Sequence, residues 1–273
     1  MTQKSEKKII IITGNETRHV YFRKFISNHP QIKVLLSLCE GTELSLEKRV
    51  KNNQESSLLE YQHVEARTQS EEDFFRSSIE NMVDKSNPKF IQKGSINDEE
   101  VVEEILAINP DLLVCYGSSL VKSKLLEVFD GNFLNVHLGL SPYYRGSGTN
   151  IWPMINNELD MVGVTFMFID SGIDTGKIIH QIRADIFLGD SPHSIGNRLI
   201  KKMSDRYAQL IINFERLEAM NQPVEEGKLY LKKDFDSIAC RKLYDNFLNG
   251  IIEEYLKTDK MPRSIIENPV IPK

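Results

Sequence analysis

Residues 111–137 read DLLVCYGSSLVKSKLLEVFDGNFLNVH, in which two short apolar runs flank a segment with a helical pattern. The runs at 111–116 and 132–137 have the length of strands, and residues 122–129 between them are typical of a helix. Gly117 and Gly131 mark the short turns. Two strands joined through a helix by short turns indicate a right-handed parallel unit, so the chain is predicted to have an α/β fold.

The same alternation continues on both sides of this unit. Four isoleucines at 9–12 precede Gly14, as in a strand that is buried on both faces of a parallel sheet. After a polar stretch at about 40–65, a helical stripe of Phe74, Phe75, Ile79 and Met82 is followed by a helix that Asn97 is expected to cap. Further elements are predicted as strands at 32–38, 162–169 and 178–186 and a long amphipathic helix at about 194–220. We expect a Rossmann-like, mostly parallel sheet over residues 1–222, with residues 223–273 as a small C-terminal appendage.

The composition indicates which classes of protein this chain fits. Of 273 residues, 40 % are hydrophobic and 27 % are charged, which is typical of a soluble globular chain with a large core. The net charge of −5 argues against a dedicated nucleic-acid binder. No apolar run approaches the roughly 18 residues that a membrane span needs. We therefore expect no nucleic-acid partner and no membrane segment.

The compartment is predicted from the N-terminus and the cysteines. Four consecutive isoleucines are too few for the core of a secretory signal. Cys39, Cys115 and Cys240 lie far apart, which fits neither a disulfide framework nor a CxxC site. A reducing cytoplasm is the expected location.

Asn135 and His137 are two positions apart on a predicted strand, so their side chains turn to the same face. They lie near the carboxyl end of that strand, where open α/β sheets place ligand crevices. The structural alternative is a pair of satisfied polar groups at the edge of the core. Asp174 lies between Gly172 and Gly176, where a carboxylate can approach a ligand or simply bond its own turn.

Other kinds of site find little support. Residues 172–177 are one residue short of the P-loop spacing and lack its hydroxyl residue. The six histidines show no i, i+4 pair and no nearby cysteine, so no metal site is expected. The GxSxG nucleophile motif is absent as well.

The segment around these polar residues contains a series of motifs at ordered positions. They are Asn135-Val136-His137, Leu140-Ser141-Pro142, Tyr144-Arg145-Gly146, Trp152, Gly163-Val164-Thr165 and Gly172-Ile173-Asp174-Thr175-Gly176. The series resembles the catalytic core of the 10-formyltetrahydrofolate-dependent formyltransferases. The resemblance covers residues 100–185 by motif and residues 9–100 only by the order of strands and helices. Ser141 departs from the family, which usually has Leu there.

The resemblance implies a catalytic trio of Asn135, His137 and Asp174. Asn135 would donate a hydrogen bond to the formyl oxygen, and His137 would take the proton of the attacking amine while Asp174 orients the imidazole or a water. The expected co-substrate is 10-formyltetrahydrofolate. Its pteridine is expected against the backbone of two loops, made of Ser119, Leu120 and Val121 and of Asp170, Ser171 and Gly172.

Members of this family differ in the amine that they formylate. Methionyl-tRNA formyltransferases carry a larger C-terminal barrel domain than residues 223–273 provide, and glycinamide ribonucleotide formyltransferases have a Gly-Ser-rich loop where residues 13–18 read TGNETR. The chain therefore resembles most the sugar N-formyltransferases of surface polysaccharide biosynthesis. Their substrate is a nucleotide-linked amino sugar, such as a UDP- or dTDP-4-amino-4,6-dideoxy hexose. The two other transferases and a formyltetrahydrofolate hydrolase remain alternatives.

Four residues are candidates for contact with the nucleotide or its diphosphate, because Arg offers a planar fork for phosphate and Gly-Asn a close backbone. They are Gly14, Asn15, Arg18 and Arg145. A solvated surface charge is an equal reading of Arg18. The apolar residues of a predicted helix at 238–256 suggest either a homodimer contact or packing back onto the same chain.

Overall fold

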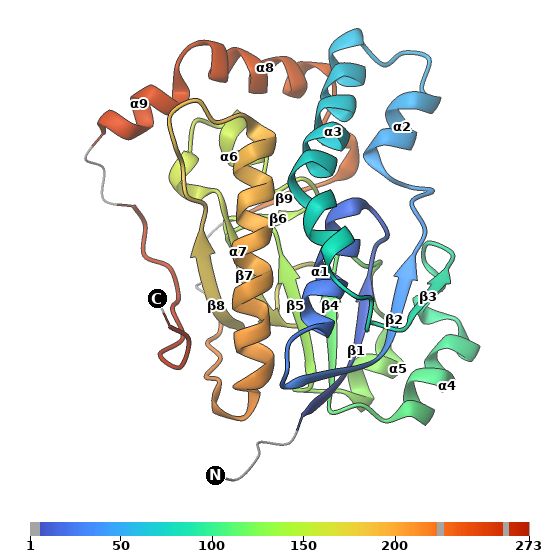
Figure 1. Ribbon diagram of the computed structural model, residues 1–273. Helices are drawn as coiled ribbons and strands as arrows, with labels where there is room; N and C mark the ends of the chain where they lie inside the picture. The colour runs from blue at the N-terminus through green and yellow to red at the C-terminus, as the bar shows by residue number, and fades with distance from the viewer. Residues whose placement is uncertain (1–5, 223–226, 259–261, 273) are drawn as a thin grey trace.

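A computed structural model describes residues 6–222, 227–258 and 262–272 of the chain (Figure 1). Its centre is a seven-stranded sheet in the order β3-β2-β1-β4-β5-β7-β8. The strands are β1 (Lys7–Thr13), β2 (Ile32–Glu40), β3 (Pro88–Ile91), β4 (Leu112–Tyr116), β5 (Phe133–His137), β7 (Gly163–Phe168) and β8 (Ile178–Arg183). Pairing is parallel from β3 to β5 and antiparallel from β5 to β8. The predicted α/β fold with a mostly parallel sheet is confirmed.

Helices cover both faces of this sheet (Figure 1). On one face lie α1 (Thr17–Ser27), α3 (Leu58–Asn81) and α7 (Pro192–Ile212), and on the other α4 (Glu99–Ile108) and α5 (Ser123–Val128). Strand β1 shows the cause, since Ile9 and Ile11 belong to one hydrophobic core and Ile10 and Ile12 to the other. This strand is therefore buried on both faces, as its unbroken isoleucine run predicts.

Three local predictions need correction. Asp98, and not Asn97, is the N-cap of α4, while the Asn97 side chain accepts the Lys122 backbone N–H (2.7 Å) and donates to the Leu120 carbonyl (2.9 Å). Helix α7 ends at Ile212 and is followed by a short 3-10 turn, well before 220. The polar stretch at 40–65 contains α2 (Leu46–Asn52) and the start of α3. Both helices begin at a serine that accepts a backbone N–H, so local capping makes this polar segment helical.

The C-terminal segment packs back onto the same chain. Strand β9 (Lys228–Tyr230) pairs in parallel with β6 (Tyr144–Gly146), next to the short helix α6 (Trp152–Ile155). The predicted helix at 238–256 is two helices, α8 (Ser237–Leu248) and α9 (Ile251–Lys257), because Gly250 adopts a left-handed φ of 82°. Helix α8 packs against α3 and α6. Residues 223–226, where the predicted appendage begins, lie outside the described residues, and the division at 222/223 remains a proposal.

Two further observations concern the three cysteines and the apolar character of the helices. Cys39, Cys115 and Cys240 are buried and free. Over the described ranges, the helices do not include one with both the length and the apolar character of a membrane span.

Candidate active site

Strand β5 carries two of the three predicted catalytic residues. Asn135 lies opposite Met167 and His137 opposite Thr165 of β7. The chain then continues from β7 into the loop that holds Asp174 and returns as β8. Because β7 runs antiparallel to β5, it ends opposite Leu134, and the loop that follows carries Asp174 back to His137.

His137 lies between two acceptors. Its Nδ1 is 3.2 Å from Oδ2 of Asp174, and its Nε2 is 2.8 Å from the carbonyl oxygen of Tyr144. Both side chains are largely buried, His137 at 7 % and Asp174 at 13 % exposed, so water competes little for these contacts. Because both neighbours accept, a ring with a proton on each nitrogen satisfies both contacts, whereas a neutral ring satisfies one.

The Asp174 carboxylate is held in place from several sides. Its Oδ2 accepts the backbone N–H of Gly146 (2.9 Å). The residue has a left-handed φ of 53°, and the Gln222 side chain donates to its carbonyl (2.8 Å) and to that of Gly176 (2.9 Å). A Cβ on Gly176 would lie 1.8 Å from the Phe168 carbonyl oxygen, so only glycine fits there. The glycines around Asp174 thus let the loop fold tightly enough to point the carboxylate at His137.

A cavity of about 720 Å³ opens beside the trio. Asn135, His137 and Asp174 line one end, and the cavity extends over the ends of β1, β2 and β4 to residues 229–235. Among the described residues, the Asn135 side-chain amide has no hydrogen-bond partner in the protein. An amide donor, an imidazole and a carboxylate therefore meet at the wall of one cavity, where they can donate a hydrogen bond to a developing oxyanion and exchange a proton with a ligand.

The two loops predicted to hold the pteridine also border this cavity. Ser119, Leu120, Val121, Asp170 and Gly172 line it, and Ser171 lies outside its lining. Leu120 and Ile173 are 62 % and 36 % exposed there. Two uncovered apolar side chains on facing loops fit a flat ring system such as a pteridine. The Asp170 carboxylate stabilises its own loop, because it accepts hydrogen bonds from the Gly172 N–H (3.0 Å) and the Thr175 hydroxyl (2.8 Å).

The residues predicted to contact the nucleotide separate into two groups. Gly14, Asn15 and Arg18 line the cavity at the end of β1. Arg145 lies on β6 outside the lining, and its Nε is buried with no hydrogen-bond partner among the described residues. The structure thus places three of the four candidates on the cavity wall.

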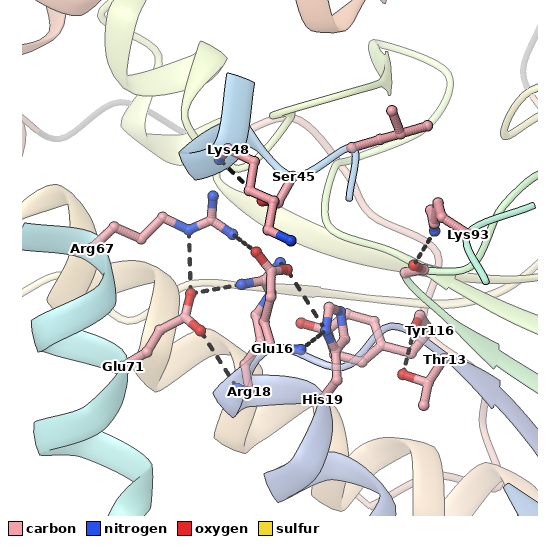
Figure 2. Close-up of polar contacts among 12 residues, drawn as sticks. Thr13, Glu16, Arg18, His19, Ser45, Lys48, Arg67, Glu71, Lys93 and Tyr116 are labelled. Atoms are coloured by element: carbon pink, nitrogen blue, oxygen red, sulfur yellow. Dashed lines mark hydrogen bonds and ion pairs between the residues drawn. The ribbon is translucent and has the colours of Figure 1, made fainter. Parts of the chain in front are cut away.

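Arg18 is part of a group that we call the Arg–Glu quartet, consisting of Arg18, Arg67, Glu16 and Glu71. Arg18 is paired with Glu16 and with Glu71 (2.7 Å), and Arg67 with Glu71 (3.2 Å) and Glu16 (3.6 Å). Figure 2 shows both guanidinium groups turned toward the two carboxylates. Burial opposes ionisation of Glu16, but Arg18 and Arg67 lower its pKa to about 2. The quartet thus pairs two guanidinium groups with two carboxylates.

His19 was missed as a site residue because no partner spacing singled it out. Its ring lies against Gly14 and Gly117, where an added Cβ would come within 2.7 and 2.5 Å of it. The Glu16 backbone N–H donates to Nδ1 of His19 (3.2 Å), so Nε2 carries the proton of the neutral ring. Burial, and then Arg18, hold the pKa of His19 well below its usual range. The available sequence signal was the capping spacing of Glu16 and His19 at the start of α1.

Comparisons with known proteins bear on the family of the chain. The family model described as "Formyl transferase" matches residues 7–211. Methionyl-tRNA formyltransferases from Thermodesulfovibrio yellowstonii and Clostridioides difficile are 33 % and 35 % identical over 58 % and 55 % of this chain. These alignments cover 54 % and 46 % of the relatives, so the chain spans about half the length of the curated proteins that it matches.

Solved structures share the fold at lower identity. Glycinamide ribonucleotide transformylase 1 from Symbiobacterium toebii has a TM-score of 0.54 at 15 % identity, covering 80 % of this chain and 96 % of that one. A sugar N-formyltransferase from a Shewanella species also has a TM-score of 0.54, at 17 % identity, covering 84 % and 78 %. At these identities the two structures establish a shared fold.

Proposed function

The chain belongs to the formyl transferase family, and we propose that it transfers a formyl group to the primary amine of a nucleotide-linked amino sugar. The donor used by this family is 10-formyltetrahydrofolate. The observation that carries the proposal is the contact of His137 with Asp174 beside Asn135 on the wall of the cavity. A cytoplasmic location fits the free, buried cysteines.

The bound donor supplies an activated formyl carbon. The loops at 119–121 and 170–172 would hold its pteridine between Leu120 and Ile173. The side-chain amide of Asn135 donates a hydrogen bond to the formyl oxygen, on which negative charge develops as the amine attacks. A fixed donor of this kind lowers a barrier by about 3 kcal/mol.

His137 and Asp174 handle the proton that the amine must lose. His137 accepts this proton and becomes an imidazolium. Both ring nitrogens then donate, Nδ1 to Asp174 and Nε2 to the Tyr144 carbonyl. These two acceptors are therefore in place for both N–H groups of the ring after proton transfer. As the bond between the amine and the formyl carbon is completed, the bond from that carbon to the folate nitrogen breaks, and tetrahydrofolate leaves with a proton on that nitrogen, which restores the neutral imidazole.

The size of the cavity fits a small-molecule acceptor. A volume of about 720 Å³ is in the range of small-molecule sites. Part of the wall comes from the C-terminal segment, through Leu229, Tyr230, Leu231, Lys232 and Phe235. The acceptor would therefore lie between the β1 end and the C-terminal segment, with its amine directed at the trio.

The test is a panel of acceptors. The protein is incubated with 10-formyltetrahydrofolate and UDP- or dTDP-linked amino sugars, with glycinamide ribonucleotide, or with methionyl-tRNA, and formyl gain is followed by mass spectrometry. We expect one formyl group on a nucleotide-linked amino sugar. Modification of only the tRNA or the ribonucleotide contradicts the proposed acceptor, and release of formate with no modified acceptor indicates a hydrolase.

A further inference from the structure

Three cations outside the Arg–Glu quartet line the same cavity. They are Arg49 on α2, Lys93 after β3 and Lys232 after β9. Their charges act on one another, since burial, followed by Lys93 and Arg49, lowers the pKa of Lys232. Folding therefore gathers like charges from three separate segments at one part of the cavity, and such a cluster attracts an anion.

The three cations differ in how their charges are balanced. Lys93 pairs with Glu40 (2.8 Å), whose carboxylate is fully buried and also accepts the Gly94 backbone N–H (2.9 Å). Arg49 donates to the Phe235 carbonyl (3.0 Å), and Lys232 to the Leu44 carbonyl (3.4 Å). Backbone carbonyls carry no net charge.

No carboxylate of the described residues forms an ion pair with Arg49 or Lys232. The acids that act on Lys232 over a longer range, Glu16 and Glu40, are already engaged by other cations. Two positive charges thus remain uncompensated at the cavity, in contrast to Arg18 in the quartet.

The same two residues connect the two sides of this part of the cavity. Arg49 reaches from α2 to the backbone of Phe235, and Lys232 reaches from the C-terminal segment to the backbone of Leu44. Each side therefore brings one cation to the gap between them. An anion with several oxygens can contact both, because the Arg fork binds two oxygens and the Lys ammonium a third.

We propose that Arg49 and Lys232, with Lys93 beside them, bind the diphosphate of the acceptor substrate. The identity of the acceptor rests on the proposed function, whereas the anion site stands on the charges described above. This site takes the place of Arg18, whose charge Glu16 and Glu71 already balance. The folate glutamate carboxylates are the other source of anionic oxygens that this cavity could receive, and the experiment separates the two.

The experiment uses Arg49→Gln, Lys232→Gln and the double variant of the full chain. The matched controls are Lys233→Gln and Arg241→Gln, exposed cations near Lys232 that lie outside the cavity lining. Binding of inorganic pyrophosphate, UDP and dTDP is measured by calorimetry, and KM is measured separately for the amino-sugar nucleotide and for 10-formyltetrahydrofolate. Thermal melting and the conservative Arg49→Lys variant identify any variant that fails to fold.

We expect each single substitution to weaken pyrophosphate and nucleotide binding about 10-fold, and the double substitution about 100-fold. The KM for the amino-sugar nucleotide should rise in parallel while kcat and the KM for the donor stay near wild type. The two control variants should bind as the wild type does.

Unchanged pyrophosphate and nucleotide binding in the double variant overturns the inference. A rise confined to the KM of the donor, larger for the polyglutamylated form, also overturns it by assigning the cations to the folate tail. Loss of pyrophosphate and UDP binding in a protein that formylates no amino sugar supports the anion site and rejects the proposed acceptor. The two proposals can therefore fail separately.

Discussion

The two ends of the cavity use charge in opposite ways. At the end of β5, His137 faces one carboxylate and one carbonyl, and Asn135 has an unused amide. At the end of β1, two arginines are paired with two glutamates. A charged side chain on a cavity wall therefore indicates a ligand contact only when its charge is not already balanced by the protein.

The largest expected effect is at the β5 end. Asp174→Asn keeps the shape of the side chain and removes the charge that stabilises the His137 imidazolium. We expect kcat/KM for formyl transfer to fall by about 100- to 10,000-fold with little change in melting temperature. Asp185→Asn, which removes an exposed carboxylate paired with Lys202, is the control. A wild-type rate in the Asp174 variant would remove the proposed role of this residue.

At the β1 end the expected effect is on stability. Glu71→Gln leaves the half-buried Arg18 and Arg67 with a single carboxylate between them, and we expect a loss of about 2 kcal/mol in the free energy of unfolding. Glu80→Gln on the same helix is the matched control, because Glu80 is 66 % exposed and lies 4.0 Å from an exposed Arg76. Its loss should be below about 1 kcal/mol. Equal losses in urea unfolding would show that the quartet is not a buried charge network.

A smaller effect is expected where His19 meets the backbone. Gly117→Ala places a Cβ at a φ of 70° and 2.5 Å from the His19 ring, whereas Gly131→Ala has a φ of 71° and no atom within 4 Å. Both should cost about 1 kcal/mol for the left-handed backbone. The difference between their unfolding free energies measures the His19 contact, and no difference would mean that the ring moves away freely.

The last expected effect is a change in the pH dependence of stability. Burial lowers the pKa of His63 to about 3 and that of His193 and His180 to about 4, against an ordinary value of 6.5. Below pH 6.5 these histidines bind protons in the unfolded chain, whereas in the folded chain they stay neutral until a lower pH. Stability is therefore highest above pH 6.5 and falls as the pH drops toward 4, by about 1 kcal/mol per pH unit for each histidine.

His180→Gln tests this dependence. Urea unfolding of the wild type and the variant is compared between pH 7.5 and 5. The variant should lose one histidine's share of the slope, whatever its absolute stability. An unchanged slope would mean that His180 takes up its proton in the folded state.

The parts of the fold that sequence reasoning predicted are those with a local cause. The isoleucine run at 9–12 and the Asn-x-His pair at 135–137 depend only on strand periodicity. The polar stretch at 40–65 was not recognised as helical, because two serine caps and tertiary contacts outweigh its low hydrophobicity. Asn97 was assigned to a cap because its contacts with Leu120 and Lys122 cannot be seen along the chain.

The candidate trio could be predicted from residue type and order along the chain, because short motifs determine which groups a strand and a tight loop present. The balance of charge could not be recognised in this way, because Arg18 pairs with Glu71, and Arg49 and Lys232 come to line one cavity, only after distant segments pack together. Electrostatic energy depends on distance in space, so the state of each charge in this cavity was decided by the folded arrangement.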